Sequence, residues 1–190
     1  MKTIATNRRP AAQVGSLFDF ELYPDSALIP SGKPLFLPEF APGFAAAIAP
    51  VFRVSRLGKE IRPKFAPRYY DAVSLAARVF PTNSPIMPAI QRPDLVKGFD
   101  GAIVLGAWQP LPADGAPLTV FADGKEIASL SPAEVGVDDI IAAVSSIMTL
   151  KMGDLVMPCY IDHHIDLSVG LDMNFSLAKD SAPCLRLKIK

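Results

Sequence analysis

Nineteen prolines are spread along this 190-residue chain, and they restrict its fold more than any other feature of the sequence. Proline lacks a backbone N–H and fixes φ, so it is poorly tolerated inside helices and central strands. Prolines at such short intervals favour short strands joined by loops over a bundle of helices. Half of the residues are hydrophobic and 20% are charged, which is the composition of a globular domain with a packed core.

Short apolar runs between the prolines predict the strands. Residues 184–190 give the clearest pattern, because Leu185, Leu187 and Ile189 alternate with basic residues, as in a strand with one buried face. Further strands are predicted at 27–29, 35–37, 51–54, 101–106, 118–122 and 154–157. The Asp-Gly pair within 122–125 predicts a hairpin turn.

Few helices are expected, and all of them are short. Residues 131–134 read Ser-Pro-Ala-Glu, a helix start with serine as the N-cap and glutamate three residues later. The apolar residues of 138–147 form one stripe, which predicts a helix there, with Asp138 and Asp139 in the first turn where the helix dipole favours carboxylates. A less regular apolar spacing predicts another helix over 68–78.

Charge and targeting patterns exclude several classes of function. Lys plus Arg equals Asp plus Glu at 19 each, and the basic residues are scattered, so no nucleic-acid-binding surface is expected. The N-terminus lacks the apolar core of a signal peptide, and no apolar run is long enough to cross a bilayer. Cys159 and Cys184 form no CxxC pair, so neither a zinc knuckle nor a disulfide scaffold is indicated. We therefore expect a cytoplasmic protein with reduced thiols and no membrane partner.

Several short motifs, taken in order, resemble the fumarylacetoacetate hydrolase family. They are Leu-Gly-Lys at 57–59, Arg-Tyr-Tyr-Asp at 68–71, Lys-Gly-Phe-Asp-Gly-Ala at 97–102 and Met-Gly-Asp-Leu at 152–155, preceded by fitting stretches at 24–28 and 32–38. The resemblance runs from about Tyr23 to Lys190, so we expect a family-like domain over 23–190 after a short divergent N-terminal segment, 1–22. It implies a mainly β (α+β) fold: the mixed β-sheet roll of the family's C-terminal domain, with few short helices.

The resemblance also implies a chemistry. Proteins of the family cleave carbon–carbon bonds of diketo acids by hydrolysis, and relatives decarboxylate, isomerise or hydrate similar oxo acids. They need a divalent cation, usually Mg²⁺ or Ca²⁺, which acts as a Lewis acid on the oxygens of the substrate. In the family a Glu-x-Glu pair and a later Asp hold this cation through the carboxylate oxygens that hard ions prefer.

This chain departs from the family at those ligand positions. Aligned without gaps from the Leu-Gly-Lys and Tyr-Tyr-Asp motifs, the Glu-x-Glu positions fall on Ala47 and Ala49, and the Asp position falls on Arg78. We therefore expect no metal at this site and no cofactor. Lys97 matches the family's site lysine and is the candidate catalytic residue. Arg78 and Lys97 form a candidate anion pocket, with Asp100 as an acid that could compensate them.

Three functional hypotheses remain open at this point. The first is a non-catalytic binding or structural protein, a pseudoenzyme that keeps the roll and a homodimer and binds a small carboxylate or oxo acid. The second is a metal-independent or altered hydrolase, decarboxylase or isomerase of a small oxo acid, in which Arg78 and Lys97 replace the charge of the cation. The third is a metal enzyme rebuilt around Asp162, His163, His164 and Asp166, although an exposed polar loop is the expected structure of that cluster.

Overall fold

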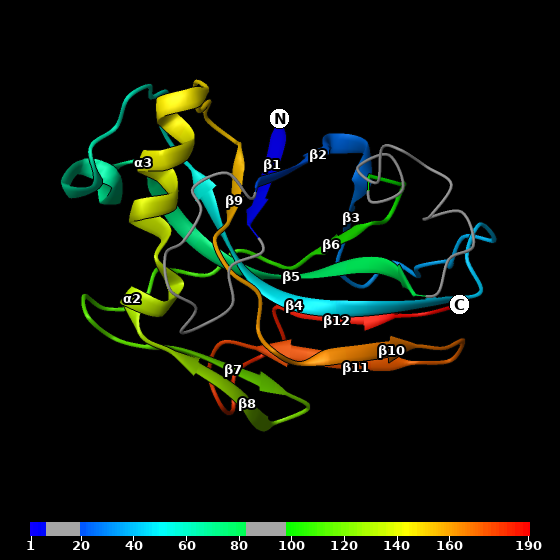
Figure 1. The fold of residues 1–190 in the computed structure, drawn as a ribbon. Coiled ribbons are helices and arrows are strands. Elements are labelled where there is room, and N and C mark those ends of the chain that lie inside the picture. The colour runs from blue at the N-terminus through cyan, green and yellow to red at the C-terminus, as the bar shows by residue number, and fades with distance from the viewer. Residues whose placement is uncertain (7–19, 83–97) are drawn as a thin grey trace.

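The fold is described by a computed structural model for residues 1–6, 20–82 and 98–190, which form two packed β-sheets (Figure 1). The larger sheet contains, in spatial order, β2 (Phe20–Pro24), β1 (Lys2–Thr6), β9 (Leu155–Met157), β4 (Gly43–Val54), β5 (Tyr70–Thr82), β6 (Ile103–Leu105) and β3 (Leu28–Pro30), with β10 (His164–Leu167) paired to β4. The smaller sheet contains β12 (Leu185–Lys188), β11 (Asp172–Ser176), β7 (Leu118–Ala122) and β8 (Lys125–Leu130).

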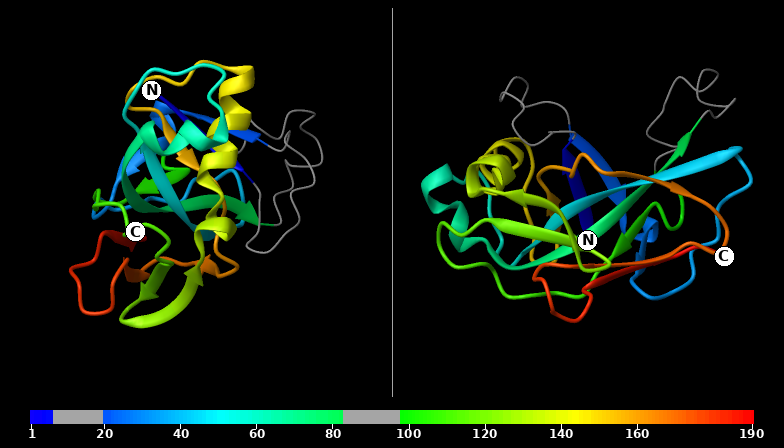
Figure 2. Two further views of the ribbon diagram at one scale, coloured as in Figure 1. Left: turned by 90° about the vertical axis from the view of Figure 1, so that its left-hand side faces the viewer. Right: turned by 90° about the horizontal axis from the view of Figure 1, so that it is seen from below.

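The helices are few and short, and the longest gathers with α2 and η2 at one end of the molecule (Figures 1 and 2). Within the described residues they are η1 (Asp25–Ala27), η2 (Pro63–Arg68), α2 (Pro132–Val135) and α3 (Val137–Ile147). The larger sheet is mixed, because β1 pairs with β9 and β3 pairs with β6 in parallel while the other pairs are antiparallel. The predicted mainly β fold with a mixed, curled sheet is confirmed.

Several local predictions are also confirmed. Helix α3 covers the predicted range, and the Ser131 side chain accepts from the Glu134 N–H while Glu134 accepts from the Ser131 N–H, completing the predicted capping box. Asp123 and Gly124 both have positive φ, 46° and 80°, as the tight turn of a β-hairpin requires. In the last strand, Leu185 and the apolar residues that alternate with it are buried.

The helix predicted over 68–78 is wrong, because these residues lie at the end of η2 and in strand β5. Strand β5 pairs with β4 along nearly its whole length, and both strands are buried on both faces. A strand covered on both faces is continuously apolar and lacks the alternation that marks a half-exposed strand. The apolar spacing of 68–78 therefore carried no periodicity that could distinguish a strand from a helix.

Residues of β4 alternate between two cores. Phe44, Ala46 and Ile48 face the smaller sheet and join the main core between the sheets. Ala49 and Val51 face the opposite side, where they join a second core with residues of β1, β2, β6 and β9. This second side is the inner face of the curled sheet, and we call it the inner face below.

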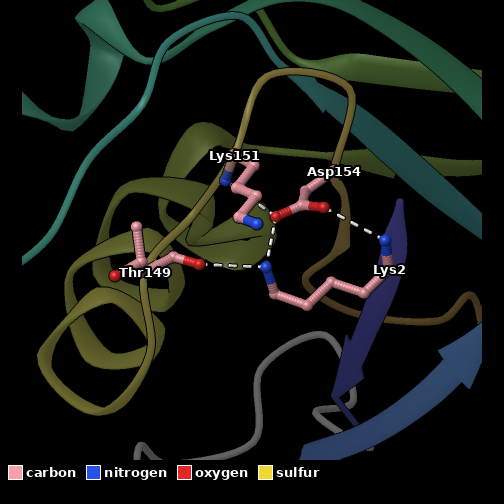
Figure 3. A network of polar contacts seen from close by, with 4 residues as sticks. All are labelled: Lys2, Thr149, Lys151 and Asp154. Carbon is pink, nitrogen blue, oxygen red and sulfur yellow. Dashed lines mark hydrogen bonds and ion pairs between the residues drawn. The ribbon is translucent and has the colours of Figure 1, made fainter.

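A buried carboxylate, Asp154, fixes β1 to the start of β9 (Figure 3). It accepts hydrogen bonds from the backbone N–H groups of Lys2 at 3.0 Å and Lys151 at 2.8 Å, and it forms an ion pair with the Lys2 ammonium. The same ammonium donates to the carbonyl of Thr149 at 2.9 Å. Because Asp154 is only 2% exposed, these partners replace the water that a carboxylate loses on burial.

Candidate functional site

The pairing of β4 with β5 brings the predicted metal-ligand positions together on the inner face. Ala47 lies directly opposite Arg78, and Ala49 lies opposite Ala76. Directly paired residues of antiparallel strands point to the same face, so Ala47, Ala49 and Arg78 share one face of the sheet. All three are buried, with Arg78 9% exposed.

Arg78 forms a compact polar cluster with two residues of β2, Glu21 and Tyr23. Its guanidinium forms an ion pair with Glu21 and donates a hydrogen bond to the Tyr23 hydroxyl oxygen at 3.2 Å. Tyr23 in turn donates to Glu21 at 2.8 Å, and Arg78 also donates to the carbonyl of Thr6 at 3.3 Å. We call Arg78, Glu21 and Tyr23 the arginine cluster.

The arginine cluster is compensated within the protein. The side chains of Arg78 and Glu21 are 11% and 15% exposed, so each has lost most of its water and relies on the other. Burial raises the pKa of Tyr23 to about 12, against the opposing effect of the Arg78 charge, which keeps the phenol neutral. The guanidinium also lies over the Tyr23 ring, 5.8 Å from its centroid.

Of the other predicted site residues, one lies outside the described part of the chain and one is exposed. Lys97 lies outside the described residues. Asp100 is exposed, and the acid that forms an ion pair with Arg78 among the described residues is Glu21. The candidate anion pocket of Arg78, Lys97 and Asp100 stays a prediction, to which the structure adds the ion pair of Arg78 with Glu21.

Glu21 and Tyr23 were missed because the family resemblance begins only near Tyr23. The segment 1–22 nevertheless supplies β1 and most of β2 to the larger sheet. One signal was present in the sequence: in Phe20-Glu21-Leu22-Tyr23 the two polar-headed residues are two apart, so a strand places them on the same face. Which cation that face meets depends on a long-range pairing that the local pattern does not contain.

The side chains at this place do not fit a divalent cation. A hard dication takes about six oxygen ligands, several of them carboxylates. Ala47 and Ala49 offer methyl groups, and Arg78 brings a positive charge already bound to the carboxylate of Glu21. In the described part of the chain, no group of three or more His, Cys, Asp or Glu side chains is arranged to hold a metal ion.

The Asp162–Asp166 cluster lies partly in β10, next to this site. His164 pairs directly with Ala47 and therefore lies on the same face of the sheet as Arg78. Its exposed imidazole packs edge-on against Phe80, with ring centroids 5.7 Å apart. The predicted exposed loop is thus partly a strand, in which Ile165 is buried and its two neighbours are exposed.

Solved structures with the same fold were found, although no family model and no curated protein matches the sequence. The chain has the fold of fumarylacetoacetate hydrolase proteins, which confirms at the level of the fold the resemblance seen in the motifs. A fumarylacetoacetate hydrolase family protein from Yersinia pestis has a TM-score of 0.78 at 16% identity, with 100% of this chain and 93% of that chain covered.

Two enzymes with the same fold carry more specific names. 5-Carboxymethyl-2-hydroxymuconate delta-isomerase from Mycobacterium smegmatis has a TM-score of 0.81 at 18% identity, with 99% of this chain and 76% of that chain covered. Fumarylpyruvate hydrolase from Pseudomonas aeruginosa, solved in complex with Mn²⁺ and pyruvate, has a TM-score of 0.75 at 19% identity, with 99% and 88% covered. At these identities the likeness shows the fold.

The prediction that no cofactor is used is contradicted by the Pseudomonas aeruginosa structure, because a protein of this fold binds Mn²⁺ there. The same structure shows an ion other than the Mg²⁺ or Ca²⁺ that the resemblance implied. For the membrane prediction, no helix of residues 1–6, 20–82 and 98–190 is long and apolar enough to span a bilayer.

Proposed function

We propose that this chain is a member of the fumarylacetoacetate hydrolase family in which a built-in ion pair has replaced the family's metal-binding carboxylates. In this proposal the protein is a non-catalytic binding or structural member of the family. The observation that carries it is the position of Arg78, which lies opposite Ala47 and is paired with Glu21. A guanidinium fixed to a carboxylate at this place competes directly with a dication for the same carboxylate.

Turnover assays test the proposal. Acylpyruvates and oxaloacetate are supplied to the purified protein in the presence of Mg²⁺ and, separately, of Mn²⁺. We expect no turnover above the rate in buffer with either ion. Turnover that requires one of the ions and is lost in Arg78→Ala would overturn the proposal, because it would show that the cluster takes part in metal-dependent catalysis.

A gain-of-ligand variant provides a matched control for this assay. Ala47→Glu/Ala49→Glu/Arg78→Asp places three carboxylates on the inner face, where the resemblance puts the family's ligands. We expect calorimetry to show tighter Mn²⁺ binding by the variant than by the unaltered protein. Equal Mn²⁺ binding by the two proteins would contradict the assignment of these three positions.

The second candidate is an enzyme that handles a small oxo acid without a metal at this place, and one observation favours it. His164 presents an exposed imidazole on the same face as the arginine cluster, directly opposite Ala47. An imidazole can transfer a proton near neutral pH, as an isomerase or decarboxylase requires. Turnover of an oxo acid in the presence of a chelator, lost in His164→Gln, would favour this candidate over the non-catalytic one.

We also propose that the protein is a cytoplasmic homodimer whose ligand is a small carboxylate or oxo acid, and that it binds neither nucleic acid nor membranes. The support is the fold shared with enzymes of small acids, one of them solved with pyruvate. Light scattering at micromolar concentration checks the dimer, and a monomeric mass would contradict it. Thermal-shift measurements with pyruvate and oxaloacetate check the ligand class.

A further inference from the structure

A cavity of about 620 Å³ lies at the helical end of the molecule, where buried lining residues belong to the main core and thus to the other side of β4 and β5 from the arginine cluster. It is bordered by η2, by α2 and the start of α3, and by the segment that leads into β7, all of which gather at the left of Figure 1. Its volume falls in the range of small-molecule sites. Nothing in the proposed function uses this cavity.

The walls of the cavity are apolar and partly aromatic. Phe52 and Tyr70 form an edge-to-face pair with ring centroids 5.3 Å apart. The remaining apolar lining comes from four prolines and from buried aliphatic residues, among them Leu118, Leu130 and Val135. These walls suit the apolar body of a ligand.

The polar groups of the cavity are all acidic or hydroxylic. Asp114, Asp138 and Asp139 contribute to the lining, and the described residues that line it include no lysine, arginine or histidine. Tyr70 donates its hydroxyl proton to Asp138 Oδ1 at 3.0 Å. Among the described residues, none of the three carboxylates has a cationic partner.

In this arrangement the charged form of the half-buried Asp138 is destabilised. Burial and the neighbouring Asp139 raise the pKa of Asp138, while the hydrogen bond from Tyr70 opposes that rise. The carboxylate is therefore less favoured in the folded protein than in water. A cation placed between these acids would remove the penalty.

A simpler explanation exists for two of the acids. Asp138 and Asp139 lie in the first turn of α3, where carboxylates stabilise the helix dipole. That explanation does not cover Asp114, which comes from a different segment and lies close enough to Tyr70 to raise its pKa. Nor does it account for a cavity with aromatic walls beneath the acids.

We propose that this cavity binds a small organic cation: a protonated amine carried on an aromatic or aliphatic body. The ammonium lies between Asp138 and Asp114, where it forms charge-assisted hydrogen bonds, and the body packs against Phe52 and Tyr70. We call this place, defined by Asp114, Asp138, Tyr70 and Phe52, the acidic cavity.

Three probes of nearly equal size test the proposal on the full chain. Benzylammonium is the cation, benzyl alcohol the neutral analogue and phenylacetate the anion, each titrated while the amide resonances of the protein are followed by NMR. We expect saturable shifts with benzylammonium at residues around Asp138 and Asp114. Its affinity should exceed that of benzyl alcohol at least tenfold, and phenylacetate should not bind.

Variants of the lining carboxylates test whether benzylammonium binds in this cavity. Asp138→Asn keeps an oxygen that can accept from Tyr70, and Asp114→Asn is a change at an exposed loop, so the double variant should remain folded. We expect it to bind benzylammonium at least tenfold more weakly, while Asp180→Asn, at an exposed acid that does not line the cavity, binds it unchanged. Equal affinity for the cation and the alcohol, equal binding by the double variant, or no saturable binding of benzylammonium would each overturn the proposal.

Discussion

Two tyrosine–carboxylate hydrogen bonds lie on opposite sides of the β4–β5 pair, and they differ in whether the protein supplies a cation. In the arginine cluster, Tyr23 donates to Glu21 at 2.8 Å, and Arg78 neutralises the carboxylate. In the acidic cavity, Tyr70 donates to Asp138 at 3.0 Å, and the described residues provide no cation there. In the first arrangement the protein supplies the counter-charge, whereas in the second the described residues leave a charge that a ligand can satisfy.

This difference in charge compensation indicates which of the two regions is suited to binding a ligand. The place that the family resemblance marks as the metal site holds an internal ion pair, and separating the partners of a buried pair costs free energy. The acidic cavity lies in a region for which the resemblance implies no chemistry, yet its carboxylates have no cationic partner among the described residues. The predictions below either separate these two regions more sharply or show that they are alike.

The largest effect is expected from breaking the arginine cluster. Arg78→Ala removes the guanidinium that pairs with the mostly buried Glu21, and losing one partner of a buried pair costs about 3–5 kcal/mol. For a chain of this size that corresponds to a fall in Tm of roughly 2–4 °C per kcal/mol. Urea denaturation measures the loss of free energy of unfolding, and calorimetry measures the fall in Tm.

A double variant separates lost charge from lost packing. Arg78→Met/Glu21→Leu removes both charges and keeps apolar bulk, so it should recover most of the stability that Arg78→Ala loses. If Arg78→Ala lowers the free energy of unfolding by less than about 1 kcal/mol, the cluster is not a compensated buried pair. The two regions then do not differ in the way described above.

A third carboxylate, Asp154, gives an intermediate case. It is more buried than either charged residue of the arginine cluster, but its cationic partner Lys2 has a side chain that is 28% exposed and can regain water. We expect Asp154→Asn to destabilise the protein by about 2 kcal/mol, chiefly through the backbone N–H groups that lose a charged acceptor. Asp172→Asn, which breaks an exposed pair with Arg186, is the matched control and should change urea stability little.

The comparison also explains which parts of the structure could be predicted from the sequence. Helix α3 and strand β12 carry their periodicity locally, and both were predicted correctly. Strand β5 was misassigned in part because burial on both faces removes that periodicity. The ordered motifs predicted that positions 47, 49 and 78 belong together, and the register of β4 and β5 pairs Ala47 with Arg78.

What the sequence did not predict depends on contacts between distant segments. The carboxylate of Glu21 reaches Arg78 only because β1 joins β2 to the larger sheet through β9. Asp138 was interpreted as a helix-dipole residue, since its contact with Tyr70 joins residues 68 positions apart. A local pattern gives the side chain's type and face, but the partner across the fold comes from tertiary packing.

Removing each tyrosine hydroxyl gives a smaller, pH-dependent difference between the two regions. Tyr23→Phe loses hydrogen bonds to two charged groups and should cost about 1–2 kcal/mol at pH 8. Burial raises the pKa of Tyr23 from 10.0 to about 12, so the folded protein keeps a proton that the unfolded chain releases. Stability from this group is complete below pH 10 and is lost as the pH rises through 12. Urea midpoints at pH 8, 10 and 11.5 should show the gap between Tyr23→Phe and the unaltered protein narrowing with pH, and a constant gap would contradict the assignment.

The smallest effect is expected at the acidic cavity, and its sign should be opposite. The raised pKa of Asp138 means that the folded state holds its proton more tightly than the unfolded chain, so ionisation of this group lowers stability as the pH rises through the folded pKa. Asp138→Asn removes that loss and keeps an acceptor for Tyr70, so it should be slightly more stable than the unaltered protein at pH 7 and no more stable at pH 3. Asp139→Asn is the comparison variant, because this exposed carboxylate also lies in the first turn of α3. Its replacement removes a favourable interaction with the helix dipole, along with the repulsion of Asp138, which, after burial, is the smaller of the two causes that raise the pKa of Asp138. At pH 7 the urea midpoints of the two variants should therefore move in opposite directions from that of the unaltered protein. If Asp138→Asn is destabilising at pH 7 like Asp139→Asn, then Asp138 serves the helix alone, and the cavity beneath it carries no unmet charge.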